Sequence, residues 1–296
     1  MQVSVFDLKG AEKGKIEVPK KLLAPKRKDI VKKAFLAEKS ETRQPYGTDP
    51  EAGQRSSAYY HGRRSKRNSM MNREMARMPR VINMGFLNFR ARNVPQAVKG
   101  RKAHPPKAEK VWTLKINKKE WTSALYSAMS FTFDKNAVSL RGHDVSSLKS
   151  YPLVLDDSFQ EMKKTKEVVD VLNVLGFEKE LERCSEKKIR ATKGKMRGRK
   201  YKEKKGPLII VNEDKGIGNA SKNIPGVDFR MAGKLDVMSL APGAHPGRLV
   251  IWTKSALESF NKTKEDKKEK AVKVKKAVSP KADAPKKKTS AKEKAK

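Results

Sequence analysis

A stretch of 69 residues, from Thr42 to Lys110, most restricts what this chain can fold into. It carries 16 lysines and arginines against four acidic residues, and 11 of the 16 are arginines. No apolar period persists through it, proline and glycine recur, and its aromatic residues are scattered: Tyr46, Tyr59, Tyr60, Phe86 and Phe89. Ordering one residue costs on the order of 1–2 kcal/mol of conformational free energy, which so few apolar side chains do not offset. The stretch therefore either stays disordered or is ordered by a polyanion.

The charge of the whole chain indicates the class of partner. Among its 296 residues, 70 are lysine or arginine and 33 are aspartate or glutamate, which gives a net charge of +37. Phosphate is the abundant anion that such an excess neutralises, so nucleic acid is the leading partner. An anionic membrane surface is the second candidate, but the sequence has no long apolar run, no signal-peptide pattern and no basic amphipathic helix. We expect a cytoplasmic protein without a membrane partner.

Hydrophobic periodicity on both sides of this stretch predicts an α/β domain. Short apolar runs predict strands at residues 3–6, 137–140, 153–155, 207–211, 236–240 and 249–252. Helical spacing of apolar residues predicts helices at 29–39, 117–130, 165–175 and 178–184. Capping-box spacing is present at Asn117–Glu120 and at Ser255–Glu258, where a short last helix should begin, and Gly176 stands at an expected C-terminal cap. Strands that alternate with helices indicate a three-layer α/β/α domain with a mostly parallel sheet.

The predicted organisation has three parts. Residues 1–41 and 111–260 form the α/β domain, 42–110 form a long irregular basic loop, and 261–296 form a disordered Lys-rich tail. From Lys262 onward the tail has 15 lysines, no arginine and five acidic residues, so it is either a solubilising extension or a non-specific phosphate-binding segment. A second basic run, Glu186–Lys205, interrupts the α/β pattern with 11 basic and two acidic residues.

No constellation typical of an enzyme stands out. Gly216 and Gly218 follow a strand, as in a dinucleotide-binding fingerprint, but Ser221 replaces the third glycine, so a plain turn is favoured. The four histidines are dispersed without a second histidine or an acid at metal-ligand or triad spacing, and loop contacts to phosphate or backbone are expected for them: His61, His104, His143 and His245. Cys184 is the only cysteine, which excludes an internal disulfide and a Cys-rich zinc site. We predict no catalytic residue, no cofactor and no metal.

The basic segments carry the stronger signal. Arginine binds phosphate through two parallel hydrogen bonds and stacks on bases, and interleaved aromatics offer surfaces for unstacked bases, as in folded RNA. Two rival hypotheses remain. One is an RNA-modifying enzyme with a nucleotide cofactor near Gly216, and the other is a DNA-packaging protein that relies on the tail.

Several segments together resemble the archaeal and eukaryotic branch of the ribosomal protein L4 family of the large subunit. They occur in order along the chain as VPQAVKGRKAHPPKAEK (94–110), INKKEWTSALYSAMS (116–130), RGHDV (141–145), KIRATKGKMRGRKY (188–201), GPLIIVNEDKGI (206–217), NIPGVDF (223–229) and LAPGAHPGRLVIWTKSAL (240–257). The resemblance extends from the first residues to about Phe260. This chain departs from it in a glycine-poor loop tip, VINMGFLNF, and in the tail.

This resemblance implies a structural protein without catalysis that binds large-subunit ribosomal RNA (rRNA) and supports subunit assembly. Its long loop would thread the RNA to the wall of the nascent-peptide exit tunnel, beside the L22 family protein. We expect rRNA and neighbouring ribosomal proteins as partners, and no DNA. The residues expected on rRNA are Arg43, Arg55, Arg63, Arg64, Arg67, Arg73, Arg77, Arg90, Arg92, Arg101 and Lys102 in the loop, with Lys193, Lys195, Arg197 and Arg199 as a second contact.

The loop tip is expected between Arg80 and Arg92. Its tunnel-proximal residues would be Arg80, Met84, Phe86, Leu87 and Phe89. The apolar members either face the tunnel or pack in an RNA or protein cleft, and packing is favoured because large exposed apolar patches usually mark contact sites.

Overall fold

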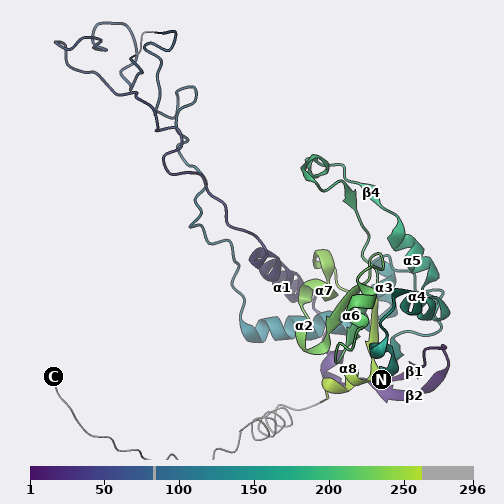
Figure 1. Cartoon of the computed structure of the whole chain (residues 1–296). Helices are drawn as coiled ribbons and strands as arrows, with labels where there is room; N and C mark the ends of the chain where they lie inside the picture. The colour runs from purple at the N-terminus through teal and green to yellow at the C-terminus, as the bar shows by residue number, and fades with distance from the viewer. Residues whose placement is uncertain (83–84, 262–296) are drawn as a thin grey trace, which may run out of the picture. The chain divides into compact units, whose positions relative to one another are not determined.

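The computed structural model describes residues 1–82 and 85–261, and the chain divides into two compact units (Figure 1). One unit joins Met1–Leu36 to the described residues from Ile116 onward, and the other is Ala37–Lys115. The predicted tail lies outside the described residues from position 262 onward, and so does Met84.

The first unit is built on a six-stranded sheet, counted over the described residues, in the order β2-β1-β3-β8-β6-β7. Its strands are β1 (Gln2–Phe6), β2 (Glu12–Glu17), β3 (Leu153–Leu155), β6 (Leu208–Val211), β7 (Asp228–Met231) and β8 (Val250–Thr253). β1 and β2 pair antiparallel, and each of the other neighbouring pairs is parallel. The predicted mostly parallel α/β sheet is therefore confirmed.

Both faces of the sheet are buried, because the central strands send apolar side chains to each side in turn. In β8, Val250 and Trp252 belong to one core cluster, whereas Ile251 and the preceding Leu249 belong to the other. The first face is covered by α1 (Lys28–Glu41), α2 (Lys118–Thr132), α7 (Val237–Leu240) and α8 (Lys254–Ser259), and the second by α3 (Lys135–Leu140), α4 (Thr165–Val174) and α6 (Ile217–Ser221). This arrangement gives the three expected layers.

The remaining elements are short. α5 (Glu178–Ser185) precedes a two-stranded hairpin formed by β4 (Lys188–Ile189) and β5 (Tyr201–Lys202). Single 3-10 turns connect the larger elements: η1 (Lys20–Leu23), η2 (Asp157–Glu161), η3 (Lys193–Arg197), η4 (Ala232–Lys234) and η5 (Pro242–Ala244).

Two predicted strands are wrong, since residues 137–140 and 236–240 form the helices α3 and α7. In α3 the side chain of Asp134 accepts a hydrogen bond from Asn136 N at 3.1 Å, and such a cap favours a helix start. In α7 the buried residues Val237 and Leu240 are three positions apart, which places them on one helical face. Each run is too short for its period to distinguish strand from helix.

Both predicted capping boxes fail in detail. Asn117 is the N-cap residue of α2, but its side chain makes no capping hydrogen bond. α8 begins at Lys254, and the backbone N–H of Ser255 donates to Asp157 Oδ1 of the η2 turn at 2.9 Å. Gly176 does follow α4, with a φ of +92° that favours glycine.

The edge strands β2 and β7 were not predicted. β2 has the sequence EKGKIE and is exposed except at Ile16, so it has no apolar alternation that would reveal a strand. Its five pairings with β1, from Gln2–Glu17 to Phe6–Glu12, hold it in the sheet instead.

A fully buried arginine, Arg248, connects several elements at the β7 side of the sheet through its hydrogen bonds. Arg248 donates from Nε to Gly206 O at 2.9 Å and from Nη1 to Ser239 O at 2.8 Å, and its Nη2 lies 2.7 Å from Asp228 Oδ2. These bonds join the approach to β6, the start of β7 and the helix α7. Partial burial acts to raise the pKa of the Asp228 carboxyl, but Arg248 and Lys205 together hold it below its usual value.

We predict that Arg248→Met lowers the free energy of unfolding by roughly 3 kcal/mol, because it removes a fully buried guanidinium that pairs with the half-exposed Asp228 and leaves carbonyl groups without donors. The matched control is Arg230→Met, whose guanidinium forms a half-exposed pair with Asp236 at 3.7 Å and should cost less than about 1 kcal/mol. Urea denaturation of both variants measures the difference. Equal losses would contradict this role of Arg248.

Candidate nucleic-acid interface

Within the second unit, Ala37–Lys115, the outgoing and returning segments of the chain run side by side (Figure 1). Thr48 N donates to Pro106 O at 3.0 Å. A Cβ added at Gly47 would lie 2.5 Å from Ala108 N, and one at Gly53 would lie 2.7 Å from the Arg101 backbone. Glycine therefore permits the close approach of the two segments, and Gly53 also has a φ of +80°.

We predict that Gly47→Ala separates the two segments, because its methyl group would overlap backbone atoms of Ala108. Such overlap costs on the order of 1–3 kcal/mol. The amide of Thr48 should then exchange with solvent about 10-fold to 100-fold faster, as measured by hydrogen exchange. Gly85→Ala is the control, since its added Cβ has no neighbour within 4 Å among the described residues beyond the adjacent ones in the chain, and it should leave the Thr48 amide unchanged.

Arg80 holds the far part of this unit together. Its backbone forms antiparallel bridges with Tyr59 and with Ala91, so three segments of chain meet at one residue. Its guanidinium donates to Phe89 O at 2.7 Å and to Ala76 O at 3.0 Å. Arg80 was expected among the tunnel-proximal residues, whereas its guanidinium contacts the loop's own backbone.

Several arginines expected on RNA also contact the loop itself. Arg55 pairs with Asp49 at 2.6 Å and with Glu51 at 3.1 Å. Arg92 Nη1 donates to Val98 O at 2.6 Å. Arg73 lies over the Phe89 ring and Arg90 over the Phe86 ring, with 4.6 Å and 5.6 Å from guanidinium carbon to ring centroid. With few carboxylates in the loop, its arginines use carbonyl groups and aromatic rings.

A second group of cations has no such contact. Among the described residues, no hydrogen bond, ion pair or ring contact involves the side chains of Arg63, Arg64, Arg67, Arg77, Arg101 and Lys102. All of them except Arg101 are exposed. These guanidinium and ammonium groups are free to bind an external anion.

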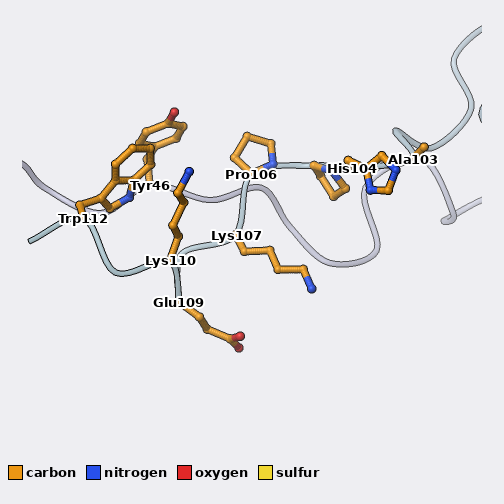
Figure 2. Close-up of a pocket in the computed structure, with 9 residues that line it drawn as sticks. Tyr46, Ala103, His104, Pro106, Lys107, Glu109, Lys110 and Trp112 are labelled. Carbon is orange, nitrogen blue, oxygen red and sulfur yellow. The ribbon is translucent and has the colours of Figure 1, made fainter.

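Aromatic and cationic side chains form a cluster at the two ends of the loop, in the sequence just after α1 and just before α2. The rings of Tyr46 and Trp112 stack with centroids 5.4 Å apart, and Figure 2 shows Lys110 beside them. The guanidinium of Arg43 lies 3.7 Å from the Trp112 ring centroid, and Lys110 Nζ lies 4.4 Å from it. Trp112 was missed because the predicted loop ended at Lys110, although an aromatic two positions beyond a basic segment was a usable signal.

At the predicted tip, the side chain of Phe86 is largely in contact with solvent. Phe86 is 84% exposed, whereas Leu87 and Phe89 are half-buried. Met84 lies outside the described residues. Among the described residues, the buried apolar side chains of the loop are Ala58, Met70 and, at the start of the predicted tip, Val81.

The second basic run forms the β4–β5 hairpin, which stands out from the sheet of the first unit (Figure 1). The residues expected on rRNA lie on and just after the η3 turn between its strands, and all four are exposed: Lys193, Lys195, Arg197 and Arg199. Gly198 closes the turn with a φ of +75°. Met196, at 82% exposed, and Tyr201 add apolar surface among the cations, as in the loop.

The prediction for His143 is wrong. This residue is buried, and its Nδ1 lies 2.6 Å from Glu180 Oε1, so it contacts a carboxylate 37 residues away instead of phosphate or backbone. Arg183 completes the cluster, because its Nη2 donates to Glu180 Oε1 at 2.7 Å. Burial lowers the pKa of His143 more than the neighbouring carboxylate raises it, so the ring is neutral at pH 7.

We predict that this histidine makes stability depend on pH. Its folded pKa is below its ordinary value of 6.5, so the unfolded chain takes up the proton first and stability falls as the pH drops below about 6.5. Urea denaturation at pH 7.5 and pH 5.5 should show a smaller loss of unfolding free energy for His143→Gln than for the unmodified chain. Identical losses would show that His143 does not titrate in this way.

The suspected dinucleotide loop binds its own carboxylate. Asp214 Oδ1 accepts hydrogen bonds from Gly216 N at 3.0 Å and from Gly218 N at 3.1 Å, where a cofactor phosphate would accept them. This geometry favours the turn and weakens the case for an RNA-modifying enzyme. In the part of the chain that the structure describes, no helix is long and apolar enough to span a bilayer.

Comparison with known proteins decides between the hypotheses. The family model described as "Ribosomal protein L4/L1 family" matches residues 16–263. The chain belongs to this family. The resemblance seen in the sequence is confirmed, and with it the prediction of a structural ribosomal protein that is not an enzyme.

Curated relatives match nearly along their whole length. "Large ribosomal subunit protein uL4" from Nanoarchaeum equitans is 46% identical over 268 residues, which cover 89% of this chain and 99% of the relative. The proteins of the same name from Sulfurisphaera tokodaii and Methanosphaera stadtmanae are 42% and 41% identical over 260 residues, covering 87% and 88% of this chain and 93% and 96% of those relatives.

Proposed function

We propose that this chain is a structural constituent of the large subunit of the cytoplasmic ribosome and binds rRNA through the loop 42–110. The single observation that carries the proposal is the group of unpaired loop cations. The six side chains of this group have no partner among the described residues, and the segment has only four acidic residues. Phosphate is the ligand that such groups bind, and the interleaved aromatics suit unstacked RNA bases.

The path of the loop supports the finer part of the proposal. Its outgoing and returning segments run side by side, and Arg80 joins three segments near the far end. We infer that this two-segment extension threads between RNA helices. We place its tip, with Phe86, Leu87 and Phe89, at the exit tunnel beside the L22 family protein. Phe86, which is 84% exposed, offers apolar surface that can be buried there.

The hairpin gives the first unit its own contact in this proposal. Lys193, Lys195, Arg197 and Arg199 are exposed around one turn, so they can contact neighbouring phosphates. Two separated contacts hold a protein more firmly than one, because the second binds at high effective concentration. The protein thereby supports assembly of the subunit.

We predict that the triple variant Arg63→Gln, Arg64→Gln, Arg67→Gln dissociates from large subunits in a high-salt wash that the unmodified chain withstands. Each charged hydrogen bond contributes on the order of 1.5–3 kcal/mol, so retention should fall by about tenfold or more. Sedimentation of washed subunits followed by quantification of the protein measures it.

The charge-matched control is Lys286→Gln, Lys287→Gln, Lys288→Gln in the tail. It removes the same three charges and should leave retention unchanged. If the two variants behaved alike, binding would be non-specific. If the unmodified chain dissociated in the same wash, the threaded loop would be excluded.

A further inference from the structure

A basic cleft lies within the first unit, and its lining residues belong neither to the loop 42–110 nor to the η3 turn of the hairpin. Its volume is about 930 Å³, within the range of ligand sites. It is bordered by the start of α1, the end of α2, α3 with the turn that follows it, the base of the hairpin and the turn at His245. Its cationic lining includes Lys28, Lys32, Arg141, Arg183 and Lys202, against the two acids Asp134 and Glu203.

The two acids of the cleft are already paired. Asp134 lies 2.5 Å from Lys26, and Glu203 lies 3.1 Å from Lys187. Lys28, Lys32 and Lys202 have no ion-pair or hydrogen-bond partner among the described residues. The cleft therefore has positive charge that the protein does not balance.

Arg141 differs from these lysines in having a buried donor without an acceptor among the described residues. Its Nη2 donates to Pro242 O at 2.8 Å, but its buried Nη1 has no acceptor within the described part of the chain. Burial, together with the neighbouring Arg248 and Arg183, lowers the pKa of this guanidinium to about 10, so it remains charged at neutral pH. A buried donor without an acceptor costs free energy, which a bound anion would recover.

Whereas Arg141 contributes a hydrogen-bond donor, His143 contributes an acceptor. It is 5% exposed, and the short contact of its Nδ1 with the ionised Glu180 places the ring proton on Nδ1. Its Nε2 is then a bare acceptor, and it too is buried without a partner among the described residues. Phosphate has no proton to give it at neutral pH, whereas a hydroxyl group does.

We propose that this cleft binds one phosphate–ribose unit of an RNA strand, with Arg141 Nη1 on the phosphate and His143 Nε2 accepting from the 2′-hydroxyl. Lys28 and Lys32 would contact the flanking phosphates. The inference rests on the proposed function in that rRNA is the partner, but it adds a site that distinguishes ribose from deoxyribose. The 2′-hydroxyl is the group by which proteins make this distinction.

The full chain labelled with ¹⁵N-histidine provides a direct test, because it has only four imidazoles. A short oligoribonucleotide should shift the His143 Nε2 resonance, and the oligodeoxynucleotide of the same sequence should not. Adenosine monophosphate and an acidic peptide are the other two probes. No shift at saturation with the oligoribonucleotide, an equal shift with the deoxy probe, or stronger binding of either other probe would overturn the proposal.

Variants test the phosphate side with the same readout. Arg141→Gln should raise the oligoribonucleotide concentration needed for half the His143 shift by about 10-fold to 100-fold. Lys32→Gln should raise it by a smaller factor and, as an exposed change on α1, leave the fold intact. Arg230→Gln, outside the cleft, is the matched control and should have no effect. If neither cleft variant weakens binding, the proposal fails.

The outcome is independent of the subunit assay. A chain that fails to join ribosomes but shows the ribose-dependent shift disproves the proposed function alone. A chain that withstands the high-salt wash without any His143 response disproves the cleft alone.

Discussion

The anchoring of α1 and α2 in one core cluster is the constraint on which the long insertion depends. The two helices flank the loop in sequence and share the core cluster on one face of the sheet, through Val31 and Ala34 of α1 and Ala124 and Ala128 of α2. Lys33 Nζ lies 2.7 Å from Glu120 Oε1, and the Ser127 hydroxyl accepts from Arg27 N at 2.7 Å. The loop's ends are therefore fixed by burial elsewhere, and the cost of closing a long loop grows only slowly with its length. A segment without a core of its own is tolerated for this reason.

The sequence reveals the parts of this fold where burial is continuous, and it misleads where burial is partial. The run LIIV of β6 is buried at every position, so the strand was predictable. Residues 137–140 and 236–240 have few buried side chains, and their capping and spacing became clear only in three dimensions. β2 gave no signal because its position depends on hydrogen bonds to β1 and not on its side chains.

The interface was predictable in composition but not in detail. An arginine in the sequence does not show whether it will contact the loop, as Arg80 and Arg92 do, or remain available, as Arg63 and Arg64 do. The buried contacts of His143 and Arg248 were invisible for a related reason. Their partners, Glu180 and Asp228, lie 37 and 20 residues away in the sequence, and only the fold brings each pair together. A pattern in the sequence does not show which buried polar groups pair when the two partners are far apart along the chain.

The edge strand β2 has a consequence for the time before the protein meets its RNA. A free sheet edge exposes unpaired N–H and C=O groups that invite another strand, and β2 forms one edge of this sheet. Its exposed residues include Glu12, Lys13, Lys15 and Glu17, so any chain adding to this edge would bring charges into contact with its own side chains. Lysines on an edge strand discourage such addition. The short, polar sequence of β2 gave no signal for a strand. The same sequence protects the newly made chain from self-association through the edge of its sheet.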